Sequence, residues 1–253
     1  MKKFTNYLIA IAAFILLGFG AKAQGGLAPL VGSTHVYTIT PGNAGNTKAW
    51  TVSPATGYTV NSGAATDQIN ITWSTAGAYT LTFTETVVAT GCATVKTATV
   101  VVGNNTFDVS VTANAAICNS LTGAVNNTDA NATTAISLPV SMVTGISSFN
   151  PNWEIKFTLT SGTATLANVT ASAGILTESA GTYTVTGIPS ATGAGSVNIT
   201  MNVTGSKIVA QSVLLTITSA KELTYNTPDK DSDDWAATQI INAVPNTSTI
   251  TTD

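Results

Sequence analysis

The sequence predicts an all-β fold of short strands packed as sandwiches. Val, Ile, Thr and Tyr alternate with small polar residues, and Gly, Asn or Pro interrupts the pattern about every 8 to 12 residues. No long stretch repeats its apolar residues with the period of about 3.6 that marks an amphipathic helix. Threonine, whose β-branched side chain fits a pleated surface, supplies 47 of the 253 residues.

Charge is scarce and entirely without arginine. The chain carries 9 basic residues, all lysine, and 12 acidic ones, so that only 8% of its residues are charged. Nucleic-acid binding needs clustered cations that displace counterions, and the net charge of −3 argues against it. The hydrophobic content of 44% suffices for a packed core. One histidine and two cysteines leave little for metal or nucleophile chemistry.

The N-terminus has the pattern of a secretory signal peptide covering residues 1–23. Lys2 and Lys3 form the positive region, residues 8–19 are apolar, and the Ala-Lys-Ala of residues 21–23 is a small-x-small cleavage site. The alternative is a membrane anchor, but the apolar run is shorter than the span of about 20 residues. Cleavage predicts a mature chain that starts at Gln24, has a net charge of −6 and contains no membrane span. The expected location is secreted, at the cell surface or extracellular, with the periplasm as the alternative.

Residues 24–103 predict the first sandwich. In one expected strand Ile69, Ile71 and Trp73 share a face, and in the next Tyr79 and Leu81 share one. The five expected strands are residues 36–40, 48–52, 67–73, 78–85 and 94–102.

A recurring motif runs through residues 28–103. Trp50 opens a strand, a Ser-Gly turn follows at residues 62–63, and the motif continues as Ile-x-Ile-x-Trp at residues 69–73. The rest of the motif is Gly-x-Tyr-x-Leu at residues 77–81, then Glu85 and a Gly-Cys pair at residues 91–92. The motif resembles the PKD-like, immunoglobulin-type repeat of secreted Bacteroidota surface proteins, which include adhesins and gliding-associated proteins. The resemblance implies an immunoglobulin-like spacer or binding unit without catalytic residues.

Residues 104–244 predict a second sandwich. Its expected strands are residues 107–112, 136–143, 153–160, 163–170, 182–187, 196–203 and 208–218. A C-terminal hairpin is expected from residues 222–225 and 237–244, and residues 245–253 are expected to form a flexible tail. The predicted fold is therefore two tandem immunoglobulin-like β-sandwich domains after a cleaved signal peptide.

The two cysteines, Cys92 and Cys118, are candidates for a disulfide. An oxidising compartment permits the bond, and closing a loop of 26 positions would stabilise the fold by about 3.5 kcal/mol. The bond would join the two predicted sandwiches. The alternative is two separate buried thiols.

An acidic loop is the candidate metal site. Asp229, Asp231, Asp233 and Asp234 surround Lys230, and alternate aspartates can direct oxygens at one Ca²⁺ ion. The loop lacks the glycine and glutamate of an EF-hand. The alternative is a solvated acidic turn. No other cofactor is expected.

Catalysis is not expected. His35 is the only imidazole, and no nucleophile elbow accompanies it. The isolated carboxylates cannot be paired as in a glycosidase. The chain is expected to be a non-enzymatic structural or adhesion protein that contacts a protein partner or assembles with itself.

A carbohydrate-binding module is the alternative function. Exposed tryptophan and tyrosine side chains could stack on a sugar. Trp50 and Trp73 are expected in the core because they are in phase with apolar neighbours. Trp153 and Trp235 flank polar turns and are the candidates for exposure.

Overall fold

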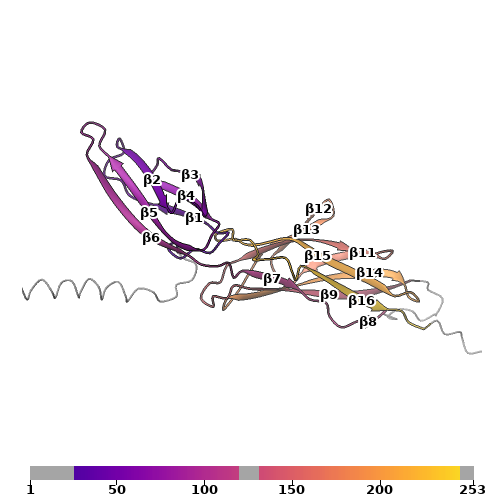
Figure 1. Ribbon diagram of the computed structural model, residues 1–253. Coiled ribbons are helices and arrows are strands. Elements are labelled where there is room, and N and C mark those ends of the chain that lie inside the picture. The colour runs from indigo at the N-terminus through magenta and orange to yellow at the C-terminus, as the bar shows by residue number, and fades with distance from the viewer. Residues whose placement is uncertain (1–25, 120–130, 246–253) are drawn as a thin grey trace, which may run out of the picture.

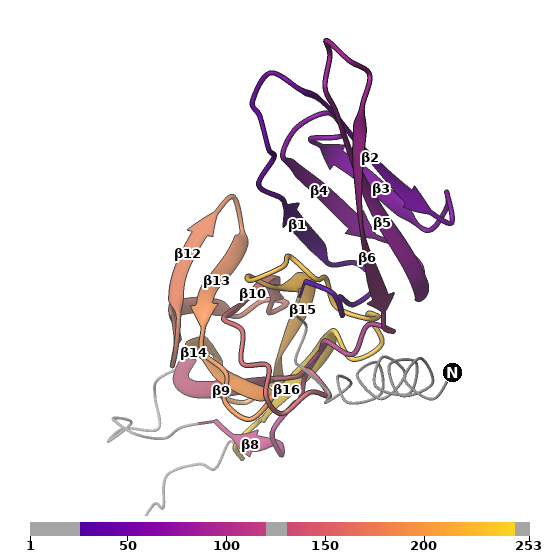
Figure 2. The same cartoon turned by 90° about the vertical axis from the view of Figure 1, so that its left-hand side faces the viewer.

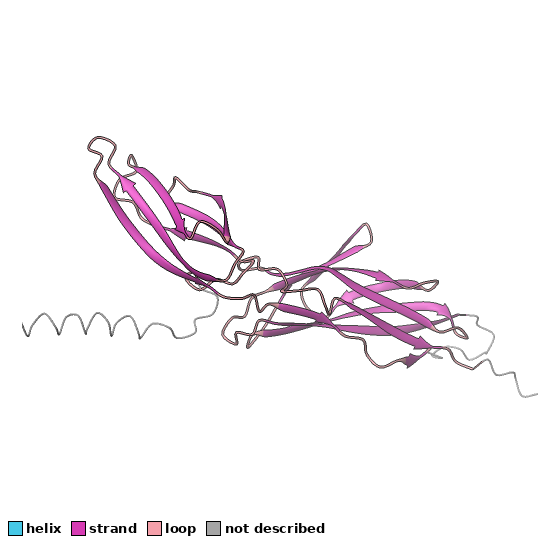
Figure 3. Cartoon of the chain, viewed as in Figure 1, coloured by secondary structure: helices cyan, strands magenta, loops and turns pink. Residues whose placement is uncertain are grey.

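The computed structural model describes residues 26–119 and 131–245, and every regular element in these ranges is a strand (Figure 3). The all-β prediction is confirmed. The predicted signal peptide, residues 1–23, and residues 246–253 of the predicted tail lie outside the described ranges. Within those ranges, no helix has the length and apolarity needed to cross a membrane.

The first sandwich contains two three-stranded antiparallel sheets (Figure 1). Its strands are β1 (Thr34–Thr38), β2 (Thr47–Ser53), β3 (Tyr58–Ser62), β4 (Gln68–Trp73), β5 (Gly77–Thr86) and β6 (Ala93–Val102). The sheet orders are β1-β4-β3 and β2-β5-β6. They match the B-E-D and C-F-G orders of an immunoglobulin domain, in which strand A would pair beside B. No described strand occupies the place of strand A.

The alternation of apolar and polar side chains along the strands produces the core of the first sandwich. Ile69, Ile71 and Trp73 are all buried on β4, as the sequence predicted. The Trp73 indole donates a hydrogen bond to the Tyr37 hydroxyl at 3.0 Å. This bond satisfies the polar end of a fully buried ring, which would otherwise be costly to desolvate.

Glu85, part of the motif that carries the resemblance, holds the β1–β2 loop. Its carboxylate accepts hydrogen bonds from the Gly42 and Asn43 amides and from the Asn46 side chain. Those amide bonds hold the pKa of Glu85 below its ordinary value. The motif glutamate is therefore a loop anchor in this chain.

The second sandwich is larger and contains a four-stranded and a six-stranded sheet (Figure 2). The four-stranded sheet is ordered β11-β14-β9-β7, and the other is ordered β12-β13-β10-β15-β16-β8. The strands are β7 (Asp108–Val111), β8 (Ile117–Cys118), β9 (Asn131–Val143), β10 (Trp153–Thr160), β11 (Thr165–Ala171), β12 (Ile175–Ser179), β13 (Thr182–Ile188), β14 (Ala194–Ser206), β15 (Gln211–Glu222) and β16 (Ala236–Asn242).

Several elements differ from the sequence-based expectation. Strands β3, β8 and β12 were not predicted, and residues 223–225 do not form the expected strand. The arms of the C-terminal hairpin are β15 and β16. The chain leaves the sheet after Glu222 because the buried carboxylate of that residue binds the backbone of the next turn. It accepts from the Thr224, Tyr225 and Thr227 amides at 2.7–3.1 Å.

The turn shaped by Glu222 joins the two sandwiches. The Tyr225 carbonyl accepts the Thr34 amide of β1 at 2.8 Å, and the Tyr225 ring stacks on His35 with centroids 4.2 Å apart. Asn105, which follows the first sandwich in sequence, donates to the Pro228 carbonyl. The joint thus depends on short polar and aromatic contacts.

Burial at the joint lowers the pKa of His35 to about 4 from an ordinary value of 6.5. The unfolded chain therefore binds a proton that the folded chain resists, and the stability contribution is lost as the pH falls below about 6.5 towards 4. We expect urea denaturation across this range to show a loss of stability that His35→Gln diminishes. Equal pH dependence in the two proteins would contradict this assignment.

Gly195 leaves room for the Trp153 ring. A Cβ at this position would lie 2.8 Å from Trp153 Nε1 and 2.8 Å from the Pro189 carbonyl oxygen. We expect Gly195→Ala to lower the free energy of unfolding by about 1–3 kcal/mol because the backbone must move. Gly45→Ala, whose Cβ would meet its nearest atom at 3.6 Å, is the control for thermal denaturation. Equal melting temperatures for the two variants would count against the crowding.

Candidate functional site: the open side of the first sandwich

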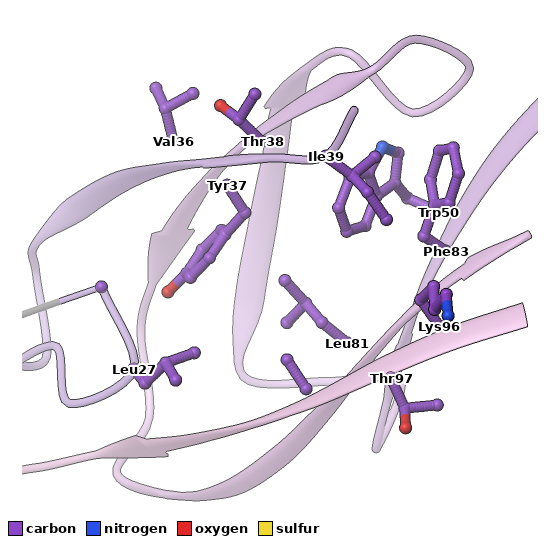
Figure 4. A pocket seen from close by; sticks show the side chains of 12 residues that line it. Leu27, Val36, Tyr37, Thr38, Ile39, Trp50, Leu81, Phe83, Lys96 and Thr97 are labelled. Atoms are coloured by element: carbon purple, nitrogen blue, oxygen red, sulfur yellow. The ribbon is translucent and has the colours of Figure 1, made fainter. Parts of the chain in front are cut away.

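A groove of about 350 Å³ runs along one side of the first sandwich, between the edges of β1 and β6 (Figure 4). Its floor is mostly apolar. The side chains of Ile39, Trp50, Leu81 and Phe83 gather between the two edges, and the Trp50 and Phe83 rings lie 4.9 Å apart. Leu27 and Val36, both more than half exposed, form part of the rim.

Both strands that flank the groove present unpaired backbone. On β6 the Val101 amide points away from β5 and donates to the Leu27 carbonyl at 2.9 Å. Because backbone groups alternate in direction along an antiparallel strand, the backbone amides and carbonyls of Thr97 and Thr99 also point away from β5. On β1 the outward residues are Val36 and Thr38 by the same alternation, since the Thr34 amide points away from β4. Within the described ranges, none of these four residues has a backbone partner on its outward side.

Lys96 supplies the positive charge among the residues that line the groove. It pairs in register with Phe83 and is in phase with Ala98 and Val100, whose side chains point into the sandwich. The alkyl part of a lysine can cover apolar surface while its ammonium group stays in water. An occupant of this groove therefore meets an apolar floor and one cation.

His35 does not form a catalytic pair with its neighbour Ser33, although Nε2 lies 2.9 Å from Ser33 Oγ. Both side chains are buried. The Ser33 hydroxyl donates its proton to the Leu30 carbonyl at 2.6 Å, so the imidazole must donate to Ser33 Oγ. An imidazole that donates here cannot act as a base toward the same oxygen. The pair holds the start of β1.

The predicted calcium ligands are only partly brought together. Asp229 and Asp231 lie with Asp108 in a group whose oxygens are within 4.8 Å of one another, whereas Asp233 and Asp234 are outside the group. Lys230 already places a cation there, with Nζ at 2.6 Å from Asp231 and 3.3 Å from Asp108. These carboxylates raise the pKa of Lys230, and Lys230 lowers that of Asp231.

Asp229 has a structural role in the acidic loop. Its carboxylate accepts from the Val109 amide at 3.1 Å and from the Trp235 indole at 2.7 Å. These bonds fasten the loop to β7 even though burial raises the pKa of the carboxyl group.

Calcium binding by the acidic loop remains a prediction. An entering ion would have to displace Lys230, so Lys230→Met is expected to bind Ca²⁺ more tightly than the native chain. Calorimetry and melting with millimolar Ca²⁺ test this. No heat and no melting shift for either protein would reject the site.

The predicted disulfide is wrong, because Cys92 and Cys118 are both exposed free thiols. Cys92 lies in the β5–β6 turn at the outer end of the first sandwich. Cys118 ends β8 at the far end of the second (Figure 1). The fold thus separates the two residues at opposite ends of the chain's two units. The alternative of buried thiols is also wrong.

The prediction that Trp153 is exposed is wrong as well. Its side chain is fully buried because it is in phase with Ile155 and Phe157 on the inner face of β10. Trp235 is half-buried and its indole is bound by Asp229. Trp73 is buried as predicted, and Trp50 is half-buried at the groove. The tryptophans therefore do not form a sugar-stacking platform on the second sandwich.

Comparison with known proteins gives weak likenesses only. No protein-family model and no curated protein matches the chain. Similar solved structures include a non-cellulosomal cohesin from the archaeon Archaeoglobus fulgidus, with 12% identity, a TM-score of 0.29, and coverage of 54% of this chain and 92% of that one. The C-terminal domain of the Streptococcus agalactiae AgI/II polypeptide BspA has 10% identity and a TM-score of 0.31, with 90% and 98% covered. The D00-D0 domain of intimin has 10% identity and a TM-score of 0.25, with 87% and 95% covered.

At these values the likenesses carry no argument about function. The class of the protein rests on its own strand order, which defines two β-sandwiches in tandem, the first with immunoglobulin-like sheets. Among the described residues, all pairs of neighbouring strands are antiparallel except β16 with β8.

Proposed function

We propose that the chain is a non-enzymatic, secreted structural or adhesion protein of the cell surface or extracellular space, and that it works through protein–protein contacts. The observation that carries the proposal is the open side of the first sandwich. An apolar groove there lies between two strands whose outward backbone has no partner at Val36, Thr38, Thr97 and Thr99 within residues 26–119 and 131–245. The motif resemblance to the PKD-like repeat of surface proteins supports the same role.

The chemistry of the groove favours an extended polypeptide as occupant. Unpaired amides and carbonyls on β1 and β6 can bind the backbone of an added strand, and the floor can receive its alternate side chains. A small ligand would leave the backbone groups of Thr97 and Thr99 unused. Strand addition uses both features of the site at once.

Light scattering during size exclusion of the mature chain, residues 24–253, tests contact formation. We expect the average mass to rise with protein concentration, because an exposed edge strand pairs with another chain. A monomer at every concentration up to the solubility limit would contradict self-association.

Surface location has its own test. Protease added to intact cells should cleave the protein if the chain is secreted to the surface, whereas a periplasmic protein stays protected until the outer envelope is opened. The predicted cleavage before Gln24 is checked by the N-terminal sequence of the secreted material.

Glycan binding remains the second candidate, because Trp50 lines the groove and is half-buried. Binding on a glycan array that disappears in a folded Trp50→Leu variant would favour it. No binding to any glycan of a broad array would favour protein contacts.

A further inference from the structure

We infer that the groove between β1 and β6 is filled by residues 245–253 of a second copy of this chain, so that copies join head to tail. The inference rests on the proposed function and adds the identity of the partner. It follows from the missing strand, the reach of the chain and the chemistry of the two surfaces.

The first sandwich lacks the strand that would close its open side. The orders β1-β4-β3 and β2-β5-β6 leave the place of the first immunoglobulin strand empty in the described part of the chain. In the described part of the N-terminal segment, from residue 26 onward, contacts to β6 are confined to one end of that strand. Leu30 bridges Gly103, and the Leu27 carbonyl accepts the Val101 amide. Thr97, Thr99 and the floor beside Phe83 remain to be covered.

The residues that precede Leu27 in the predicted mature chain are poor candidates for this task. They are Gln24, Gly25 and Gly26. Three residues extend about 10 Å, and the two glycines bring no side chain to an apolar floor. A strand from elsewhere is needed.

Residues 245–253 cannot reach the groove of their own copy. The Val244 amide donates to the Lys207 carbonyl at the far end of the second sandwich, where Ile241 pairs with Gln211 at the start of β15. From there β15 runs 12 residues, about 36 Å, before the joint with the first sandwich. Nine extended residues span at most about 32 Å, and the groove lies beyond the joint. Only the groove of another copy is accessible to them.

The sequence of this segment suits the groove. Residues 247–252 read Thr-Ser-Thr-Ile-Thr-Thr, a run of β-branched residues with strand preference. Ile250 is its large apolar side chain and fits a floor made by Trp50 and Phe83. Asp253, three residues further on, lies on the opposite, solvent-facing side of an extended strand. Lys96 is exposed and its ammonium group stays in water on that side, so the charges are complementary.

The resulting contact joins different surfaces of two copies. The groove lies on the first sandwich, and β16, the last described strand before the segment, ends at the far end of the second (Figure 1). Such a heterologous contact extends into a filament when its rotation does not close a ring. Each added copy again presents an open groove.

Cross-linking of the full mature chain tests the contact directly. Equal amounts of ¹⁴N- and ¹⁵N-labelled protein are mixed, treated with a carbodiimide that joins amines to carboxylates, and analysed by peptide mass spectrometry. We expect an amide between Lys96 and Asp253 in peptides that combine both isotopes. If assembly occurs without this mixed-isotope product, the inference is overturned.

Charge variants of the full chain provide the second readout. Lys96→Glu is expected to raise the concentration of half-maximal assembly about tenfold, and adding Asp253→Lys should restore it. Lys156→Glu, at an exposed lysine of β10 outside the groove, is the matched control and should have no effect. Ile250→Asp should also prevent assembly.

The outcomes separate the two proposals. A chain that assembles equally well with Lys96→Glu or Ile250→Asp contradicts the occupant named here while self-assembly survives. A chain that stays monomeric at every concentration contradicts self-assembly and the occupant named here, but not contact with a different protein.

Discussion

Trp153→Ala is expected to lower the free energy of unfolding by about 3–5 kcal/mol, the range for removing a fully buried aromatic ring. Trp153 has 0% exposure and packs in the main core of the second sandwich. Among the residues that the structure describes, its indole Nε1 has no hydrogen-bond partner, so the loss is one of packing and not of polar contacts. Urea denaturation followed by circular dichroism measures the change.

Trp235→Ala is the matched control, because the same ring is half-buried there. It loses the indole bond to Asp229 and should cost about 1–2 kcal/mol. Equal losses in the two variants would contradict the burial of Trp153. Sugar binding that depends on Trp153 in a folded protein would contradict it more strongly.

Glu222→Ala is expected to destabilise the joint between the sandwiches by about 3 kcal/mol, because the substitution leaves several buried donors without an acceptor. The fully buried carboxylate accepts from the Thr224, Tyr225 and Thr227 amides and from the Thr227 hydroxyl. These bonds place Tyr225 against His35. Loss of the turn should therefore free His35 and raise its pKa from about 4 towards the ordinary 6.5.

Two measurements follow the Glu222 variant: urea denaturation, and an NMR titration of the single histidine. Glu154→Ala is the control, since that acid is on β10 and is not buried. Glu222→Gln retains one acceptor oxygen and should lie between the native chain and Glu222→Ala. An unchanged His35 titration in Glu222→Ala would contradict the link between the turn and the joint.

Alternation along single strands made much of the fold predictable. Ile69, Ile71 and Trp73 share a buried face because their spacing of two matches the pleat. The same rule would have placed Trp153 with Ile155 and Phe157. The adjacent Pro-Asn turn suggested exposure instead, and the phase of the strand was the better indicator.

Features that depend on tertiary placement could not be predicted from the sequence. Glu222 looks like an isolated acid, and only the turn that folds back over it makes it a fourfold acceptor. Cys92 and Cys118 are 26 positions apart, but strand order sends them to different sandwiches. The groove lies where a strand is missing from the sheet. A missing strand leaves no pattern in the sequence of the neighbouring strands.

The scarcity of charged residues has a structural consequence at the open edge of β6. Thr97 and Thr99 occupy outward positions of β6 where lysine would discourage pairing with another chain. Lys96 is the nearby lysine. Its alkyl stem starts on the inner face of β6 and its exposed ammonium group can bind an acidic residue of an added strand.

Amide hydrogen exchange at this edge tests the central claim most directly, namely that the open side of the first sandwich binds another chain. Peptides covering β6 and β1 are compared in dilute and concentrated mature protein. Binding of another chain at the open side predicts slower exchange in the concentrated sample at the outward amides of Thr97, Thr99, Val36 and Thr38. Association without protection at these amides, or with protection confined to other strands, would contradict it.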